Sequence, residues 1–413
     1  MKENENGGAR KEKQRLPLWV NIIGALATVF CLGMAAFIAG VFAAMTGSQF
    51  FTGFYPVVVI GLMIFAVLLI FVRKRRWLWK ALLVFVVIAA LVGGAVGIYE
   101  NYVNSLAVVR SGDVDIMRYQ SYVYDIQTGK HTTINPELAR LSEATTLRFS
   151  KGEGFLPRID GATALLPVYS AFVVATYPVD GYSIKDYSSK VSCTTTSRAY
   201  QRLIDGSVDV IFVAAPSEKQ LADAQEKGVE LVFTPIGREA FVFFVNEKNN
   251  VDGLTTEQIR GIYSGEITNW KQLGGANRSI RAFQRDEGSG SQSALIRLMD
   301  GAPLIDAPID DRIDFMGGIV NKTADYKNFG NAIGFSFRFY VTEMLGDDQI
   351  KLLEIDGVYP SEQAIRDGSY PLSNTFFAVT RIDPNENVTA LVDWVVSAQG
   401  QELVEKTGYV GIN

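Results

Sequence analysis

The sequence predicts three transmembrane helices followed by an α/β domain, and two patterns in its 413 residues indicate this fold class. Long apolar runs without charge occupy the first hundred residues. From residue 156 onward, short apolar stretches of strand length alternate with amphipathic stretches of helix length, as in α/β domains. The hydrophobic fraction of 48% is high for a soluble protein. The excess of apolar residues lies in the N-terminal part of the chain.

Three apolar runs, 18–45, 54–72 and 81–98, have about the length that a bilayer core requires. None of them contains a charged residue, which is unusual for buried core helices of this length. A cleaved signal peptide does not fit, because two further runs follow the first. We therefore expect residues 1–100 to form a membrane anchor with three transmembrane helices.

Basic residues are concentrated in two of the segments that border these runs, the N-terminal segment and the loop between the second and third runs. They are Lys2, Arg10, Lys11, Lys13 and Arg15 before the first run, and Arg73, Lys74, Arg75, Arg76 and Lys80 between the second and third runs. The loop 46–53 has no charge. The positive-inside rule then places the N-terminus in the cytoplasm and everything after residue 98 outside the cell. The expected location is the cell membrane, with multiple spans through the lipid bilayer.

Residues suited to redox or metal chemistry are scarce. Cys31 falls in the first apolar run and Cys193 in the outer part, so a disulfide within the chain is not expected and both are interpreted as packing residues. The single histidine, His131, has no cysteine or carboxylate cluster beside it and is interpreted as a surface residue. It lies in the polar segment 101–150, which we expect to be an extracellular spacer. No cofactor or metal is expected.

Periodicity predicts the elements of the remaining domain, residues 151–413. Strands are expected at 157–160, 208–213, 241–245, 280–283, 333–336 and 376–379. Helices are expected at 165–176, 197–204, 218–227, 256–263, 291–299 and 389–406.

Three of these helices start with hydroxyl side chains and with backbone N–H groups that lack a partner within the helix. The three starts are 160–164, 194–197 and 285–291, and only the third adds a full positive charge, from Arg285. Taken singly, each is most often an ordinary N-cap. Ligands of open α/β sheets bind where strands end and helices begin, so the three turns together would suit a tetrahedral oxyanion.

From about residue 158 to 413 the sequence resembles the phosphate-binding proteins of phosphate ABC importers. The most specific match is 262–270 (Ile-Tyr-Ser-Gly-Glu-Ile-Thr-Asn-Trp) followed by 285–291 (Arg-Asp-Glu-Gly-Ser-Gly-Ser). Further similar segments are 161–169, 203–209, 367–372 and 400–410. The resemblance implies a two-lobed periplasmic-binding-protein fold of type II that holds an anion between its lobes, with ABC permease subunits as partners.

The resemblance also implies roles for individual residues. By position, the anion contacts are Thr163, Ala164, Thr196, Arg285, Ser289, Gly290 and Ser291. Glu287 stands where the family has an acid that orients the arginine. Many members carry an aspartate that accepts the proton of hydrogenphosphate, and Ala214 stands in its place here. Without that acceptor the site loses its means of preferring hydrogenphosphate to sulfate, and Asp160, Asp286 and Glu287 remain as possible replacements.

The leading hypothesis is a membrane-anchored extracellular protein that captures inorganic phosphate or a similar oxyanion for an ABC importer. Its lobes would close about a hinge near 239–241 and 375–377. The alternative is a sensor of the same fold that signals through its membrane segment. An enzyme is not expected, because the only histidine lies in the spacer and the Gly-Ser-Gly-Ser stretch fits neither a nucleophile elbow nor a P-loop. The acidic outer domain disfavours nucleic-acid binding, which is not expected.

Overall fold

The computed structural model describes residues 17–45, 49–72, 76–106, 108–109, 115–125, 129–152, 155–285, 289–306, 326–346 and 348–412. The chain divides into two compact units, Met1–Ser105 and Leu106–Asn413, and each is considered by itself.

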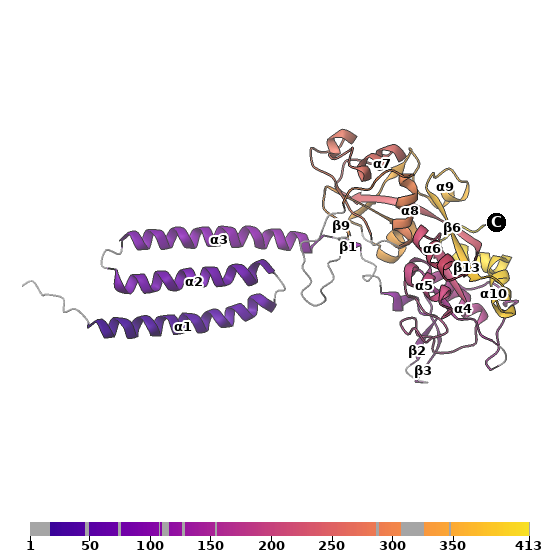
Figure 1. Cartoon of the computed structure of the whole chain (residues 1–413), viewed down its shortest axis with the longest axis horizontal. Helices are drawn as coiled ribbons and strands as arrows, with labels where there is room; N and C mark the ends of the chain where they lie inside the picture. Colours follow the sequence, from indigo (N-terminus) through magenta and orange to yellow (C-terminus); the bar gives the residue numbers. More distant parts are fainter. Residues whose placement is uncertain are drawn as a thin grey trace, which may run out of the picture. The chain divides into compact units, whose positions relative to one another are not determined.

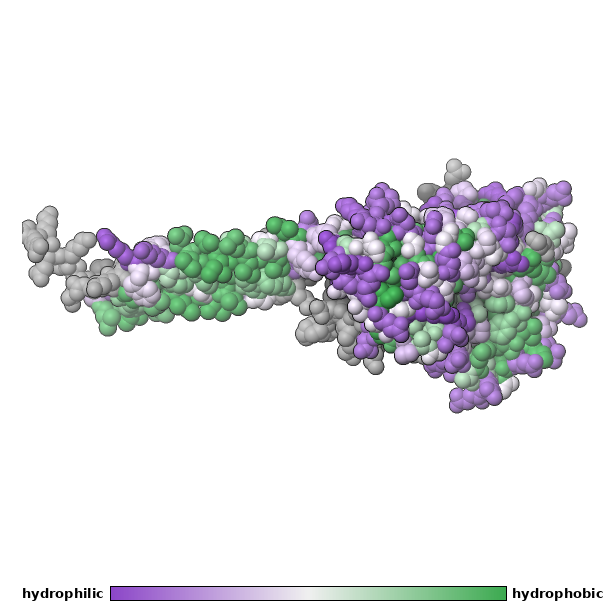
Figure 2. Space-filling model, turned by 90° about the horizontal axis from the view of Figure 1, so that it is seen from above, coloured by the Kyte–Doolittle hydropathy of each residue, from purple (hydrophilic) through white to green (hydrophobic). Residues whose placement is uncertain are grey.

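The first unit consists of the helices α1 (Leu18–Met45), α2 (Gln49–Phe71) and α3 (Arg76–Asn104). They lie side by side with α2 in the middle (Figure 1). Gly61 permits a close approach of α2 and α3, because a Cβ there would lie 2.3 Å from the ring of Phe85. Hydrophobic side chains cover much of the outer surface of this unit (Figure 2), including Phe30 at 70% exposure.

Two helical stretches among the described residues have the length and composition of a membrane span, Gly53–Phe71 and Arg76–Asn104. By length and composition of the described residues, two of the three predicted spans are supported. The described apolar part of α1, Leu18–Met34, is too short, since a bilayer core requires about 20 residues in a helix.

The second unit contains a seven-stranded mixed sheet in the order β4-β5-β13-β6-β10-β8, with β11 also paired to β6. The strands are β4 (Ile159–Gly161), β5 (Val210–Ala214), β6 (Leu231–Asn246), β8 (Arg281–Ala282), β10 (Ala332–Phe337), β11 (Ile350–Leu352) and β13 (Ser373–Arg381). The pairs β4–β5 and β8–β10 are parallel and the others are antiparallel. The α/β class predicted from the sequence is thus confirmed.

The long strand β6 belongs to both halves of this sheet. Its residues 231–240 pair with β13, whereas its residues 241–246 pair with β10 and β11. We call the part with β4, β5 and β13 the first lobe, and the part with β8, β10 and β11 the second lobe. The sequence predicts only 241–245 as strand, whereas β6 begins at Leu231 and includes Pro235 and Gly237, two residues that disfavour the interior of a strand. A register shift opposite Phe376 and Phe377 accommodates them.

Helices cover the sheet in both lobes (Figure 1). The first lobe has α4 (Leu166–Thr176), α5 (Thr196–Ile204), α6 (Glu218–Glu226), α10 (Glu386–Val396) and α11 (Ala398–Lys406). The second has α7 (Thr256–Ser264), α8 (Gly290–Met299) and α9 (Glu362–Arg366). The prediction of one helix at 389–406 is wrong, because Ser397 adopts an extended conformation and its hydroxyl donates to the carbonyl of Trp394 at 2.6 Å.

Short elements complete the second unit. They are the strand pairs β1 (Val108–Val109) with β9 (Tyr326–Lys327), β2 (Tyr122–Asp125) with β3 (Lys130–Ile134), and β7 (Gly253–Leu254) with β12 (Glu354–Ile355). One-turn helices occur at η1 (Ile116–Tyr119), η2 (Thr163–Leu165), η3 (Trp270–Leu273) and η4 (Tyr340–Leu345).

The segment 101–150, expected to be an extracellular spacer, contributes several of its described residues to the core of this unit. Tyr119, Tyr122, Leu138 and Phe149 are buried in its hydrophobic cluster. The backbone N–H of Thr146 donates to the side chain of Gln399 at 2.8 Å. The described part of this segment therefore packs against the α/β domain.

The hydrophobic core runs through both lobes and is rich in aromatic rings. In the first lobe Phe172 packs against Phe212 and meets Trp394 edge to face at 6.0 Å. In the second lobe Phe243 packs against Tyr263 at 5.8 Å. This continuous core holds the strand ends and helix starts of the two lobes in place, and a cavity lies where they meet.

Candidate functional site

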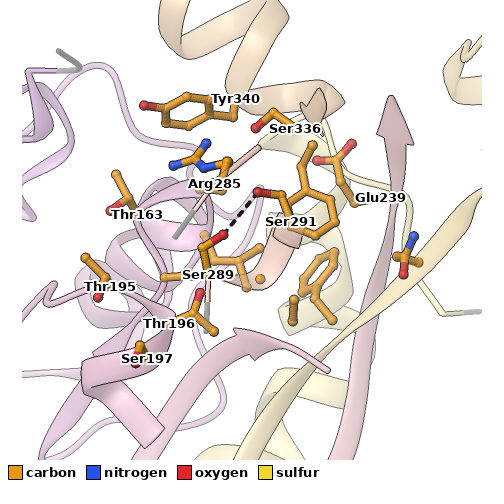
Figure 3. A pocket seen from close by; sticks show the side chains of 18 of the residues that line it. Thr163, Thr195, Thr196, Ser197, Glu239, Arg285, Ser289, Ser291, Ser336 and Tyr340 are labelled. Atoms are coloured by element: carbon orange, nitrogen blue, oxygen red, sulfur yellow. Dashed lines mark hydrogen bonds between the residues drawn. The ribbon is translucent and has the colours of Figure 1, made fainter. Parts of the chain in front are cut away.

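A cavity of about 410 Å³ lies where the two lobes meet (Figure 3). Its walls are Ala162, Thr163, Ala164, Leu165, Thr195, Thr196, Ser197, Ala214, Glu239, Arg285, Ser289, Gly290, Ser291, Ser336, Phe337, Tyr340, Asn374, Thr375, Phe376 and Tyr409. All seven anion contacts expected from the sequence line this one cavity. Glu287 and its neighbour Asp286 lie outside the described residues.

The first turn leads from β4 into η2 and α4. Gly161 is required there, because a Cβ would lie 2.6 Å from the carbonyl oxygen of Phe212 in β5. The next residue, Ala162, starts η2 without any side-chain cap. The first N–H groups of a helix have no partner within it, so those of Thr163 and Ala164 are available to a ligand at the cavity wall.

The second turn precedes α5 and has a strained backbone. Thr195 is the N-cap, with φ 94° and ψ 159°, and it makes no side-chain capping hydrogen bond. This region of backbone conformation is populated almost only by glycine. Thr196 and Ser197 follow it as the first helical residues and line the cavity.

The third turn starts α8 in the second lobe. Ser289 is its N-cap, and the hydroxyl accepts from the N–H of Gln292 at 3.1 Å. The Ser289 and Ser291 hydroxyl oxygens are 3.5 Å apart. The backbone of Arg285 is held in place by α8, because its N–H donates to the side-chain oxygen of Gln292 at 2.9 Å. Its guanidinium extends along the cavity wall in Figure 3.

The second and third turns approach closely across the cavity. A Cβ on Gly290 would lie 3.2 Å from the Cβ of Ala214 and 3.4 Å from Oγ1 of Thr196. Glycine at this position therefore lets the start of α8 come against the first lobe. Ala214, the position of the family's aspartate, is part of the cavity wall.

Asp160 is excluded as a replacement for that aspartate. Its carboxylate is fully buried and accepts from the N–H of Gly161, from the N–H and hydroxyl of Thr194, and from the guanidinium of Arg202. These bonds join the first and second turns, so Asp160 positions the loops and does not line the cavity.

The crossing strands supply the remaining polar groups. Asn374 pairs with Glu239 in the β6–β13 ladder, and both side chains line the cavity. Burial raises the pKa of Glu239 to about 8, and the nearby guanidinium of Arg338 opposes this only in part. Sequence analysis placed residue 239 at the hinge but gave its carboxyl group no role. The available signal was that Glu239 directly precedes the apolar stretch 240–245.

Tyr409 ties a distant part of the chain to the first turn. Its hydroxyl donates to the carbonyl oxygen of Ala164, and its ring stacks on Phe339 at 4.5 Å. Burial raises the pKa of Tyr409 far above its usual range, so this hydroxyl remains a donor. Val410 follows with a bridge to Arg238 of β6.

Nothing in the described part of the chain resembles a metal centre, since it contains no group of three or more His, Cys, Asp or Glu side chains placed to hold an ion. Both cysteines are free. Cys193 lies behind the first turn, with Sγ 3.9 Å from Oγ1 of Thr163. The backbone of His131 lies in β3, opposite Tyr124.

Comparison with known proteins identifies relatives of the second unit. A family model described as a PBP superfamily domain matches residues 152–399. The phosphate-binding protein PstS of Borreliella burgdorferi is 24% identical over 265 residues, which cover 62% of this chain and 89% of that protein. PstS of Staphylococcus saprophyticus is 23% identical over 272 residues, covering 63% and 82%. These relatives are binding proteins and not enzymes, in agreement with the sequence analysis.

Solved structures also match. A putative phosphate ABC transporter substrate-binding protein from Clostridium perfringens, with bound phosphate, is similar with a TM-score of 0.47 and 24% identity. The match covers 62% of this chain and 98% of that one.

Proposed function

Because the chain belongs to the PBP superfamily, whose domain spans residues 152–399, we propose that its second unit captures inorganic phosphate or a similar oxyanion. Thr163, Ala164, Thr196, Arg285, Ser289, Gly290 and Ser291 would contact the anion. The relatives that share most of this domain are phosphate-binding proteins, which supports phosphate as the first ligand to test.

One observation carries this proposal: three helix starts and one guanidinium, drawn from both lobes, line a single cavity. Two of these starts, at Ala162 and Thr195, have no side-chain cap. An oxyanion bound there would accept the N–H bonds that a capping side chain otherwise accepts, and the positive ends of the helix dipoles would favour its charge. Arg285 would neutralise that charge with charge-assisted hydrogen bonds.

The site is built from two lobes that share the long strand β6, so we expect binding to close the lobes about this strand and its neighbour β13. Thr196 and Gly290 belong to different lobes and lie close to each other. An anion that contacts both residues would therefore link the two lobes. Phosphate or sulfate offers an oxygen to each turn at once, whereas a monovalent halide does not.

Arg285→Ala should weaken phosphate binding more than the loss of any single hydroxyl, because it removes a charged hydrogen-bonding partner worth about 2 kcal/mol, roughly thirtyfold in Kd. Isothermal titration of the full chain in detergent with phosphate measures this loss. Arg140→Ala, which removes an exposed guanidinium outside the cavity, is the matched control. Equal losses for Arg285→Ala and Thr163→Ala would show that the charge partner is misplaced, and no binding of any oxyanion to the wild type would refute the function.

We further propose that the first unit anchors this domain in the cell membrane. The whole of α1, which has 28 residues and extends beyond Leu18–Met34, would form a third span. The two helices of sufficient length and the apolar surface of the unit support anchoring. Delivery of the anion to an ABC permease is the expected use of such a domain, and the permease subunits would copurify with the chain from membranes.

A sensor is the second candidate function. Three helices packed side by side are more than a tether needs, and they offer a route for transmitting lobe closure across the membrane. Copurification of a kinase or another regulator in place of permease subunits would favour this alternative.

A further inference from the structure

Glu239 is the only carboxylic acid that lines the cavity in the described part of the chain. It is 5% exposed, and the backbone N–H of Ala240 donates to its Oε1 at 3.1 Å. The backbone N–H of Phe339 also favours the ionised form of the carboxyl group. Its Oε2 is buried and has no hydrogen-bond partner. A buried polar atom in this state costs free energy unless a ligand or another group pairs with it.

The charges around Glu239 do not compensate its ionisation. The positive charge of Arg338 lowers the pKa of Glu239, but Arg338 also pairs with Glu362, whose carboxylate is 3.4 Å from the guanidinium. Tyr409 packs beside Glu239 as a neutral phenol, and Tyr340 and Arg285 complete the same cavity. Burial dominates and raises the pKa of Glu239 to about 8, so the group carries a proton at neutral pH.

We propose that Glu239 binds the oxyanion in its protonated form, donating a hydrogen bond from Oε2 to an anion oxygen. This inference rests on the proposed function of the cavity. The proton stays on Glu239, and no covalent bond of the anion breaks. At a pH where Glu239 is ionised before binding, the protein takes up one proton from solution for each anion that it binds.

The consequence is a preference that differs from that of a site with an ionised acid. An ionised carboxylate accepts the proton of hydrogenphosphate and repels a fully ionised anion. A protonated carboxyl group needs no proton on the ligand, and Ala214 supplies no charge that would repel sulfate. The site therefore accepts fully ionised oxyanions such as sulfate as well as hydrogenphosphate.

Sulfate is the suitable probe, because it does not titrate near neutral pH and any pH dependence then comes from the protein. Titration calorimetry of the full chain in detergent should show sulfate binding at about pH 7 that weakens about tenfold by about pH 9, as Glu239 ionises. Repeating the measurement at pH 9 in buffers of different ionisation enthalpy should reveal uptake of about one proton.

Two variants test whether Glu239 is responsible. Glu239→Gln keeps a hydrogen-bond donor at this position and cannot ionise, so its sulfate affinity should stay within about threefold of the wild-type value at pH 7 and should not change by pH 9. Glu230→Gln makes the same substitution at an exposed carboxylate just before β6 and outside the cavity, and should keep the pH dependence of sulfate binding.

The outcomes separate the two proposals. Phosphate binding without sulfate binding, sulfate binding that is constant with pH, or a pH dependence retained in Glu239→Gln would each overturn the role of Glu239 while leaving the oxyanion function intact. If neither anion binds at any pH, the function itself fails, and the inference fails with it.

Discussion

Thr195 holds a backbone conformation that costs about 1–3 kcal/mol for a residue with a Cβ. Thr195→Gly should relieve this strain, but glycine also makes the unfolded chain more flexible, which offsets part of the gain. We expect a net stabilisation of about 1 kcal/mol and a rise in Tm of about 2 °C. Differential scanning calorimetry of the full chain measures the shift. Thr163→Gly, at a helical residue without positive φ, should lower Tm instead. A lower Tm for Thr195→Gly would mean that its side chain stabilises the turn more than the strain destabilises it.

Glu239 also makes the stability of the fold depend on pH. Its pKa is raised from 4.5 to about 8 on folding, so between these values the folded state binds more protons than the unfolded state. Stability therefore decreases as pH rises through this window, by up to about 1.4 kcal/mol per pH unit. Glu239→Gln does not titrate, so its stability relative to the wild type should increase from about pH 5 to about pH 8.

Thermal unfolding of both proteins at the two pH values measures this difference. Glu230→Gln should show no comparable change, because its carboxylate is exposed. A difference between wild type and Glu239→Gln that is constant with pH would contradict the raised pKa.

At the scale of elements, the start of α8 sets how closely the lobes approach. Gly290→Ala places a Cβ within 3.2 Å of Ala214, so we expect the closed arrangement to be strained and phosphate affinity to fall roughly tenfold. Fold stability should not fall, since alanine is the better helix former. Titration and calorimetry distinguish the two effects. Gly330→Ala, whose Cβ would meet only the side chain of Arg278 at 3.3 Å, is a control outside the cavity. Unchanged phosphate affinity in Gly290→Ala would show that the two lobes do not close at this contact.

Most helices and strands of the second unit could be predicted because their signals are local. The predicted helix 197–204 corresponds to α5 (Thr196–Ile204), and the predicted strand 333–336 lies within β10 (Ala332–Phe337). Both have an apolar periodicity that can be read from a few consecutive residues.

Features that depend on distant partners could not be predicted in this way. The first part of β6 contains Pro235 and Gly237, and it is a strand only because β13, more than a hundred residues away, pairs with it. The role of Glu239 in the cavity follows from the same pairing. The family resemblance identified the residues of the three helix starts, but it assigned no role to Glu239.

At the scale of the whole molecule, the distribution of basic residues predicts that the binding domain is extracellular. Protease added to intact spheroplasts should therefore degrade residues 106–413 and leave the helical unit in the membrane. Immunoblotting with antibodies to each unit measures this, with a cytoplasmic protein as the control for intact membranes. Protection of the domain until the membrane is permeabilised would reverse the predicted orientation.

The hydrogen bond from Tyr409 to the carbonyl of Ala164 joins residues 245 positions apart. A ribosome must therefore translate past codon 409 before the first turn acquires this support. If the domain is extracellular, as proposed, a partly translocated chain has an incomplete cavity, and ligand capture would begin only after residue 409 has crossed the membrane.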